Sequence, residues 1–300
     1  MVDDGSRDRS LEIMESYCKQ DQRFRKIQRE REPKGVSVCR NIGISGSEGK
    51  YIIFLDSDDL LSKSCLANRV DYMENNLELD FAVFQMEAFG LKSFILTKKE
   101  DNYLDAFLTF DFPWVVTSPI WKAGFLKNGI RFNEKLKNLE DPELHIRVLK
   151  SEPNFKVLYD SEPDCYYRQH RVYRKEKSTG YTNFLKGYAL FFNNYELFDD
   201  FSQGQRKLMR YGFFRMVLNI IPPFSEFEKD LFRQTVKDLK ELNVTGSFHY
   251  LTNKWWLWVL NRVSNHNLEQ IIVYTWTLTI SPRNFVRDLV IPKINRKFDS

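Results

Sequence analysis

The chain has few residues of the kinds that form covalent or metal cross-links. Its four cysteines are Cys18, Cys39, Cys65 and Cys165, and no two of them form a Cys-x-x-Cys pair. This scatter excludes a disulfide framework and a cysteine zinc site, and it is typical of unpaired, mostly buried thiols in a reducing compartment. We therefore expect a cytoplasmic location.

Long apolar runs are also missing. No stretch reaches the ~18 consecutive apolar residues that a membrane span needs. The first residues, Met-Val-Asp-Asp-Gly, are acidic and typical of a turn, so they do not indicate a signal peptide. We expect neither a membrane-spanning helix nor secretion.

An excess of charge of one sign is the third absence. The 45 basic and 41 acidic residues are interspersed and give a net charge of +4. Without a basic stripe or an RNA-binding motif, the sequence does not favour a nucleic-acid binder. Its 300 residues are enough for a substantial core, in one large domain or in one domain with an extension.

Apolar spacing along the first third of the chain alternates between helix and strand. Helices are predicted at 10–19 and 63–76, and strands at 24–28, 51–55 and 81–87; residues 35–47 are predicted to form a Gly-interrupted loop and a short helix. Residues 2–6, Val-Asp-Asp-Gly-Ser, resemble a strand end followed by an acidic turn. This rhythm predicts an α/β fold with a mainly parallel sheet flanked by helices.

The strand predicted at 51–55 ends at three carboxylates, Asp56, Asp58 and Asp59. Acids at the carboxyl end of a buried strand lie where open α/β sheets bind ligands, and a divalent cation would offset their mutual repulsion. The alternative is a solvated turn in which Asp59 or Ser62 caps the next helix.

Three motifs in order resemble the family 2 glycosyltransferases. They are Val-Asp-Asp-Gly-Ser-Arg-Asp at 2–8, Arg-Asn-Ile-Gly-Ile at 40–44, and Gly-Lys-Tyr-Ile followed by Leu-Asp-Ser-Asp-Asp at 49–59. The resemblance covers roughly residues 1–90 and continues more loosely to about 180. It implies an inverting enzyme of the GT-A fold, here at 1–180, that uses a nucleotide-sugar donor. Residues 181–300 lose the resemblance and have helical apolar spacing, which predicts a helical C-terminal region.

The resemblance also implies roles for individual residues. The positions that match nucleotide-sugar contacts are Asp3, Asp4, Arg40, Asn41, Asp56 and Arg168, with Asp4 favoured over Asp3. Asp58 matches the ligand of a Mn²⁺ or Mg²⁺ ion that bridges the two phosphates, with Asp56 and His170 as further candidates. A lone His in an aromatic strand is also typical of a structural residue. UDP is the expected nucleotide.

Residues 138–147, Asn-Leu-Glu-Asp-Pro-Glu-Leu-His-Ile-Arg, resemble the Glu-Asp motif of the same family. The resemblance implies that Asp141 is the base that deprotonates the acceptor hydroxyl and that Glu140 contacts the acceptor. A purely structural helix start is the alternative, with Pro142 at the first helical position and acids in the first turn.

The C-terminal region combines Trp255, Trp256, Trp258 and Trp276 with scattered Lys and Arg. This pattern is typical either of a helix at a bilayer surface or of a helical subdomain packed on the core. Many family members act on lipid-linked acceptors, so we expect a peripheral enzyme at the inner membrane face. Its acceptor would be a glycan or lipid-linked saccharide of cell-surface polysaccharide or lipopolysaccharide synthesis.

Family members usually begin with a strand and helix that precede the Val-Asp-Asp-Gly-Ser motif, and neither is in this sequence. We therefore expect an N-terminally truncated enzyme. Two alternatives remain: a catalytically inactive, glycosyltransferase-like binding or scaffold protein, and a metal-dependent nucleotidyltransferase. The combination of the three motifs with a downstream Glu-Asp pair disfavours the nucleotidyltransferase.

Overall fold

The computed structural model of the 300-residue chain describes residues 1–169, 191, 201–206, 208–209 and 212. The chain divides into two compact units, Met1–Leu197 and Phe198–Ser300. Every helix and strand named below belongs to the first unit. The predicted boundary near residue 180 and the predicted C-terminal helices lie outside the described residues, apart from a few positions, and stay predictions.

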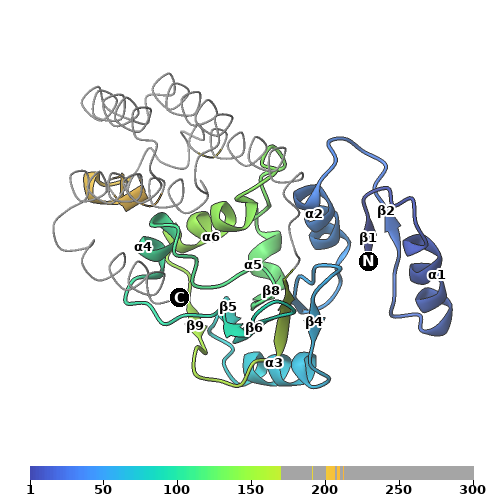
Figure 1. Cartoon of the computed structure of the whole chain (residues 1–300), viewed down its shortest axis with the longest axis horizontal. Helices are drawn as coiled ribbons and strands as arrows, with labels where there is room; N and C mark the ends of the chain where they lie inside the picture. Colours follow the sequence, from blue (N-terminus) through green and yellow to red (C-terminus); the bar gives the residue numbers. More distant parts are fainter. Residues whose placement is uncertain (170–190, 192–200, 207, 210–211, 213–300) are drawn as a thin grey trace, which may run out of the picture. The chain divides into compact units, whose positions relative to one another are not determined.

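The N-terminal part is a β-α-β unit beside a second helix (Figure 1). Strand β1 (Val2–Asp3) pairs in parallel with β2 (Ile27–Gln28), and α1 (Ser10–Gln20) connects them. Helix α2 (Val36–Gly46) follows Gly35, whose φ of 137° lies in the region that favours glycine. The predicted strand end, first helix and second strand are confirmed, with shorter strands.

Two four-stranded sheets form the centre of the described structure. One has the order β3 (Tyr51–Ile52), β8 (Pro119–Lys122), β5 (Phe81–Val83) and β9 (Phe155–Val157). The other has the order β4 (Leu60–Leu61), β10 (Cys165–Arg168), β6 (Met86–Phe89) and β7 (Phe94–Ile95). Only β5–β9 and β6–β10 pair in parallel within them; the other described pairs are antiparallel. The α/β prediction is confirmed, but the sheets are mixed rather than mainly parallel.

Two predicted strands differ in detail from the structure. The strand predicted at 81–87 is split, because β5 and β6 belong to different sheets. In the segment predicted as a strand at 51–55, only Tyr51–Ile52 pairs with a neighbouring strand, and the following residues have no regular secondary structure. Ile52 and Phe54 are buried whereas Leu55 is exposed, so the segment is not buried on both faces as expected.

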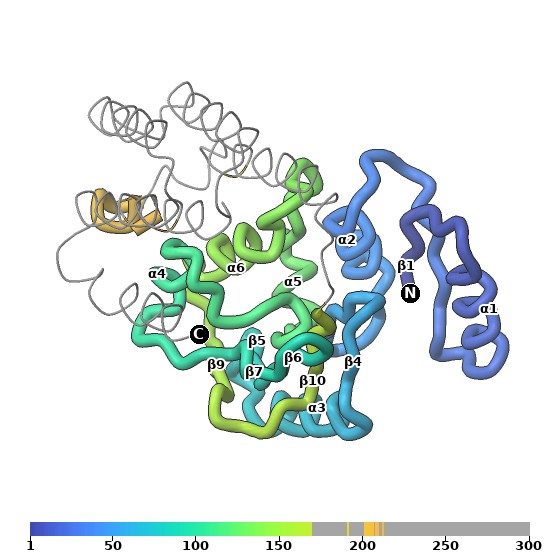
Figure 2. The backbone as a smooth tube through the Cα atoms, viewed as in Figure 1, coloured from blue at the N-terminus to red at the C-terminus, as the bar shows by residue number. Residues whose placement is uncertain are grey.

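The remaining helices cover the sheets from opposite sides. They are α3 (Cys65–Glu74), α4 (Tyr103–Leu108), α5 (Ala123–Lys127) and α6 (Glu140–Lys150). Figure 2 shows α5 and α6 on one side of the strands and α3 on the other. Among the described residues, the largest buried side chains include Trp114, Trp121 and Phe107, which pack around His145 of α6. This aromatic core fixes α6 against the sheet.

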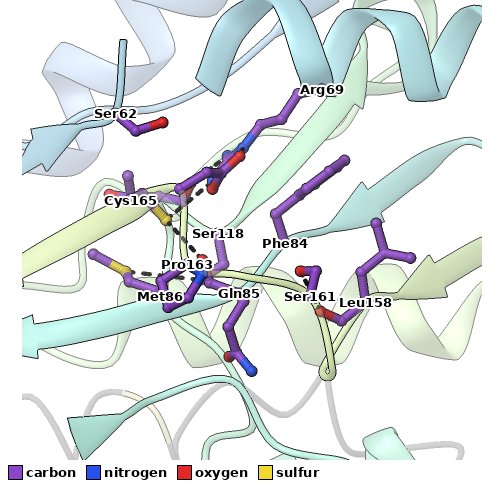
Figure 3. A network of polar contacts seen from close by, with 12 residues as sticks. Ser62, Arg69, Phe84, Gln85, Met86, Ser118, Leu158, Ser161, Pro163 and Cys165 are labelled. Carbon is purple, nitrogen blue, oxygen red and sulfur yellow. Dashed lines mark hydrogen bonds and ion pairs between the residues drawn. The ribbon is translucent and has the colours of Figure 1, made fainter. Parts of the chain in front are cut away.

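A fully buried arginine joins α3 to the two sheets (Figure 3). Arg69 donates to both carboxylate oxygens of Asp164, with N···O distances of 2.8 and 2.6 Å, and to the carbonyl of Thr117 at 2.8 Å. Its Nη2 also lies 3.0 Å from Sγ of Cys165, the first residue of β10. Arg69 of α3 is therefore joined to the residues that precede β10 and β8, by an ion pair with Asp164 and a hydrogen bond to Thr117.

Candidate active site

The acidic turn after β3 is tied to the end of strand β10. Asp59 closes the turn, because its amide donates to the carbonyl of Asp56 at 3.1 Å. The Asp59 carboxylate is buried, and it accepts hydrogen bonds from the amide of Arg168 at 3.0 Å and from the hydroxyl of Thr117 at 3.4 Å. Burial raises the pKa of Asp59 above its ordinary value, while the hydrogen bond from Arg168 opposes the shift.

The side chain of Arg168 forms a second link between the acidic turn and β10. Its Nε donates to the main-chain carbonyl of Asp58 at 2.8 Å, and its guanidinium lies 4.7 Å above the ring of Phe89. The predicted donor residue Arg168 therefore lies directly beside the predicted metal ligand Asp58, whose side chain is exposed. The N-cap position of α3 is Ser64, which forms no side-chain cap hydrogen bond, so the structure contradicts the alternative in which Asp59 or Ser62 caps this helix.

Arg40 of α2 lies among carboxylates from two distant segments. Its Nη2 donates to both oxygens of Asp56 at 2.9 and 3.1 Å, and its Nη1 donates to the carboxylate of Asp141. Glu140 lies 3.7 Å from the same guanidinium. Arg40 is only 8 % exposed. The structure thus brings together four predicted site residues, two from the donor side and two from the acceptor side.

Asp141 lies in the first turn of α6. The residue before the helix, Leu139, has a φ of 64° and no side-chain cap hydrogen bond. Pro142 is the third residue of α6 rather than the first, which contradicts that part of the structural alternative. Desolvation raises the pKa of Asp141 to about 7, and the carboxylates of Glu140 and Asp56 act in the same direction, while Arg40 opposes the shift.

Asn41, next to Arg40, forms side-chain hydrogen bonds with the segment that precedes α6. Its Oδ1 accepts from the amide of Phe132 and its Nδ2 donates to the carbonyl of Phe132, both at 2.9 Å. The same Nδ2 donates to Glu134 at 2.9 Å. Phe132 is a residue of the site that the sequence did not reveal, because an apolar side chain at this position carries no chemical signal.

The acids of the first motif differ in what their carboxylates contact. Asp3 is buried and accepts hydrogen bonds from the amides of Gly5, at 2.9 Å, and Ser6, at 3.2 Å. Hydrogen bonds from Ser6 and Gly5 lower the pKa of Asp3. Asp4 is exposed and forms an ion pair with Arg29. The Asp3 carboxylate therefore holds its own turn, whereas the Asp4 carboxylate is exposed and paired with Arg29.

The acidic turn offers some, but not all, of the ligands that a divalent metal ion needs. Carboxylate oxygens are the ligands that Mg²⁺ and Mn²⁺ prefer, and Asp56 and Asp58 present them on one turn. Within the described part of the chain, no group of three or more His, Cys, Asp or Glu side chains could hold an ion by itself. A metal here would complete its coordination with ligand oxygens. The third candidate, His170, lies outside the described residues.

The α/β fold with an acidic turn at a strand end and an acid-bearing helix start defines a class of nucleotide-dependent transferases. The sequence model of glycosyl transferase family 2 matches residues 1–152, which is half of the chain. The chain therefore belongs to the family 2 glycosyltransferases, and its fold is GT-A. The predicted family and fold class are confirmed.

Among curated proteins, the chain is 28 % identical over 170 residues to an uncharacterized glycosyltransferase, EpsJ, of Bacillus subtilis, covering 53 % of this chain and 49 % of EpsJ. It is 25 % identical over 189 residues to the poly(ribitol-phosphate) beta-N-acetylglucosaminyltransferase TarS of Staphylococcus aureus, covering 61 % of this chain and 32 % of TarS. The chain thus spans half or less of the length of these relatives.

Solved structures of S. aureus TarS share the fold. The TarS crystal structure has a TM-score of 0.59 at 20 % identity, over 82 % of this chain and 43 % of that one. TarS residues 1–349 in complex with UDP has a TM-score of 0.56 at 20 % identity, over 80 % of this chain and 70 % of that one. At this identity the likeness shows the fold alone.

Proposed function

We propose that the chain transfers a sugar from a UDP-sugar to a hydroxyl group of a saccharide acceptor, with inversion at the anomeric carbon. The observation that carries the proposal is the single guanidinium of Arg40, which contacts both the donor-side acid Asp56 and the base candidate Asp141. Family membership supports the reaction class, and the UDP and UDP-GlcNAc complexes of TarS support the choice of nucleotide.

Asp141 acts as the general base in this proposal. It takes the proton of the acceptor hydroxyl while that oxygen attacks the anomeric carbon and the bond to the diphosphate breaks. One displacement on the face opposite the leaving group inverts the anomeric configuration. A base with a pKa of about 7 is suited to this step, because it is ionised near neutral pH and still binds the proton firmly enough. Glu140, the neighbour of Asp141, contacts the acceptor.

Asp58 and Asp56 would hold the Mn²⁺ or Mg²⁺ ion, together with diphosphate oxygens. When bound, the ion neutralises the charge that develops on the leaving diphosphate. Asp4 and Arg168 complete the donor side. The position of Arg168 supports a role in binding the diphosphate. Its side chain donates to the Asp58 carbonyl and brings a positive charge next to the acidic turn.

The acceptor is proposed to be a glycan or a lipid-linked saccharide in cell-surface polysaccharide or lipopolysaccharide synthesis. The name of TarS, a poly(ribitol-phosphate) beta-N-acetylglucosaminyltransferase, describes transfer to a polymer and supports a polymeric acceptor. A cytoplasmic location with peripheral contact at the membrane face is part of the same proposal. Among the helices that the structure describes, none has the length and apolar character to cross a bilayer.

The test is a transfer assay on the full chain with Mn²⁺ and a panel of UDP-sugars, UDP-GlcNAc first. Release of UDP and the anomeric configuration of the product are measured. The proposal predicts a β-linked product from an α-linked donor. Metal-dependent UDP binding without turnover on any donor would favour an inactive binding protein, and a retained α-configuration would contradict the single displacement.

A further inference from the structure

Two consecutive residues of α2 hold one segment that is distant in the sequence. Arg40 reaches Asp141, and Asn41 reaches Phe132 and Glu134. These contacts span between 91 and 101 residues of chain. All three partners belong to the segment 132–141, which follows α5 and ends in the first turn of α6. Helix α2 is therefore the support against which this segment is placed.

The hydrogen-bonding capacity of Asn41 is used within the protein. A side-chain amide has two N–H donors, and those of Asn41 go to the Phe132 carbonyl and the Glu134 carboxylate. Its oxygen accepts from the Phe132 amide, so Asn41 pairs with Phe132 as a strand neighbour would. Asn41 is also only 6 % exposed. No donor of its side chain remains for a nucleotide.

Phe132 extends the attachment from the main chain to the side chain. Its ring is buried, lies 5.2 Å from the guanidinium carbon of Arg40, and meets the ring of Phe54 edge to face at 5.2 Å. Phe54 belongs to the segment that enters the acidic turn. The Arg40 guanidinium, which binds Asp56 and Asp141, thus packs on Phe132, and Phe132 is in turn hydrogen-bonded to Asn41. On the outer side, Arg31 pairs with Glu134 at 2.6 Å.

We propose that Arg40 and Asn41 are positioning residues, which hold the segment 132–141 against α2 and set the place of the Asp141 carboxylate, and that the side chain of Asn41 serves this purpose instead of contacting the nucleotide. This inference rests on the proposed function, in which Asp141 is the base. The energetic reason is general: a catalytic group displaced by about 1 Å can cost about 10²-fold in rate. Side chains that act through others therefore affect turnover more than ligand affinity.

The test compares Asn41→Ala, Asn41→Asp and Arg40→Lys with the wild-type full chain. Asn68→Ala is the matched control, because Asn68 is an exposed asparagine on another helix, α3. Asn41→Asp keeps an acceptor for the Phe132 amide but loses both donors. Arg40→Lys keeps the charge but loses the fork that spans two carboxylates. The measurements are kcat and KM for the donor, the Kd of UDP by calorimetry, and hydrogen exchange at the Phe132 amide.

The proposal predicts that Asn41→Ala lowers kcat roughly 10- to 100-fold, as misplacement of a base does, with the Kd of UDP unchanged. Hydrogen exchange at the Phe132 amide becomes faster in Asn41→Ala than in the wild type. In Asn41→Asp, which keeps the acceptor, the exchange is slower than in Asn41→Ala. Arg40→Lys also lowers kcat, and Asn68→Ala changes nothing. A weakened Kd of UDP with little change in kcat would overturn the positioning role and restore a nucleotide contact.

Failure of the proposed function gives a different result. If the wild-type chain transfers no sugar, the base role of Asp141 is wrong, and with it the catalytic part of the inference. If the wild-type chain is active and Asp141→Asn is not, but Asn41→Ala retains the wild-type kcat, only the positioning role is wrong. In both cases the exchange of the Phe132 amide reports whether Asn41 holds the segment.

Discussion

Arg40 and Asp141 are hydrogen-bonded although 101 residues separate them in the chain. The same guanidinium binds both oxygens of Asp56. A planar fork of this kind fixes the direction of each carboxylate as well as its charge. The donor-side turn and the start of α6 are therefore joined through one side chain, Arg40.

The pH dependence of transfer should follow Asp141. Because its pKa is raised to about 7, kcat is expected to increase as the pH rises through about 7, when the carboxyl loses its proton. The sign for stability is opposite: ionising this carboxyl costs free energy, so its contribution declines as the pH rises from the unfolded value near 3.8 to about 7. Asp141→Asn should flatten that part of the stability profile. A kcat that falls through pH 7 would contradict the assignment.

His145 should make the protein less stable in acid. Burial lowers its pKa to about 3, from 6.5 in the unfolded chain. Between these two pH values the unfolded state binds a proton on His145 and the folded state does not. The contribution of His145 to the free energy of unfolding is expected to fall by about 1.4 kcal/mol per pH unit as the pH decreases from 6.5 toward 3, opposite in sign to the contribution of Asp141 over most of this range. Chemical denaturation at several pH values measures this slope. The slopes of the wild type and of His145→Leu should differ by this contribution, and equal slopes would mean that the folded protein protonates His145 as readily as the unfolded chain does.

The Arg69–Asp164 pair should be essential for folding stability. Arg69→Met leaves the Asp164 carboxylate without its partner in a buried place, and loss of such a partner costs roughly 3–5 kcal/mol. Lys50→Met is the matched control, since it removes an exposed pair with Glu74 and should cost roughly 0–1 kcal/mol. Urea unfolding monitored by fluorescence compares the two. Equal costs would show that the buried pair contributes no more than a surface one.

Removal of metal should weaken UDP binding if the acidic turn holds the ion. We expect EDTA and Asp58→Asn to weaken the binding of UDP in calorimetry. Asp59→Ala should also weaken metal affinity, by about 10- to 100-fold, which is the usual effect of losing a residue that orients the ligands. Its carboxylate holds the turn to Arg168 and Thr117. UDP binding that is equal in Mn²⁺ and in EDTA would contradict the metal role.

Much of the N-terminal fold could be predicted, because its signals are local. The apolar spacing of α1 and the acidic turn after Phe54 appear in the sequence itself. The split at Phe84 and Gln85 between two sheets could not be predicted, because a continuous apolar run does not show which sheet each half joins. Mixed strand pairing was missed for the same reason, since it depends on β8, β9 and β10 from far along the chain.

The candidate site was predictable in its chemistry but not in its connections. Asp56, Asp58 and Asp141 are found from motifs, because carboxylates at strand ends and helix starts have a recognisable pattern. The pairing of Arg40 with Asp141 and of Asn41 with Phe132 depends on tertiary contacts across most of the domain. Buried Asp59 differs from its neighbour Asp58 only through packing against β10, which no local pattern reveals.

The most direct test of the account is sugar transfer by the full-length chain and its Asp141→Asn variant, with UDP affinity measured for both. Asp160→Asn, an exposed aspartate on the same unit, is the control. Loss of a general base should lower kcat by about 10²- to 10⁴-fold, while the Kd of UDP and the activity of the control stay at wild-type values. Asp141→Asn with wild-type kcat would contradict the central claim that this carboxylate is the base.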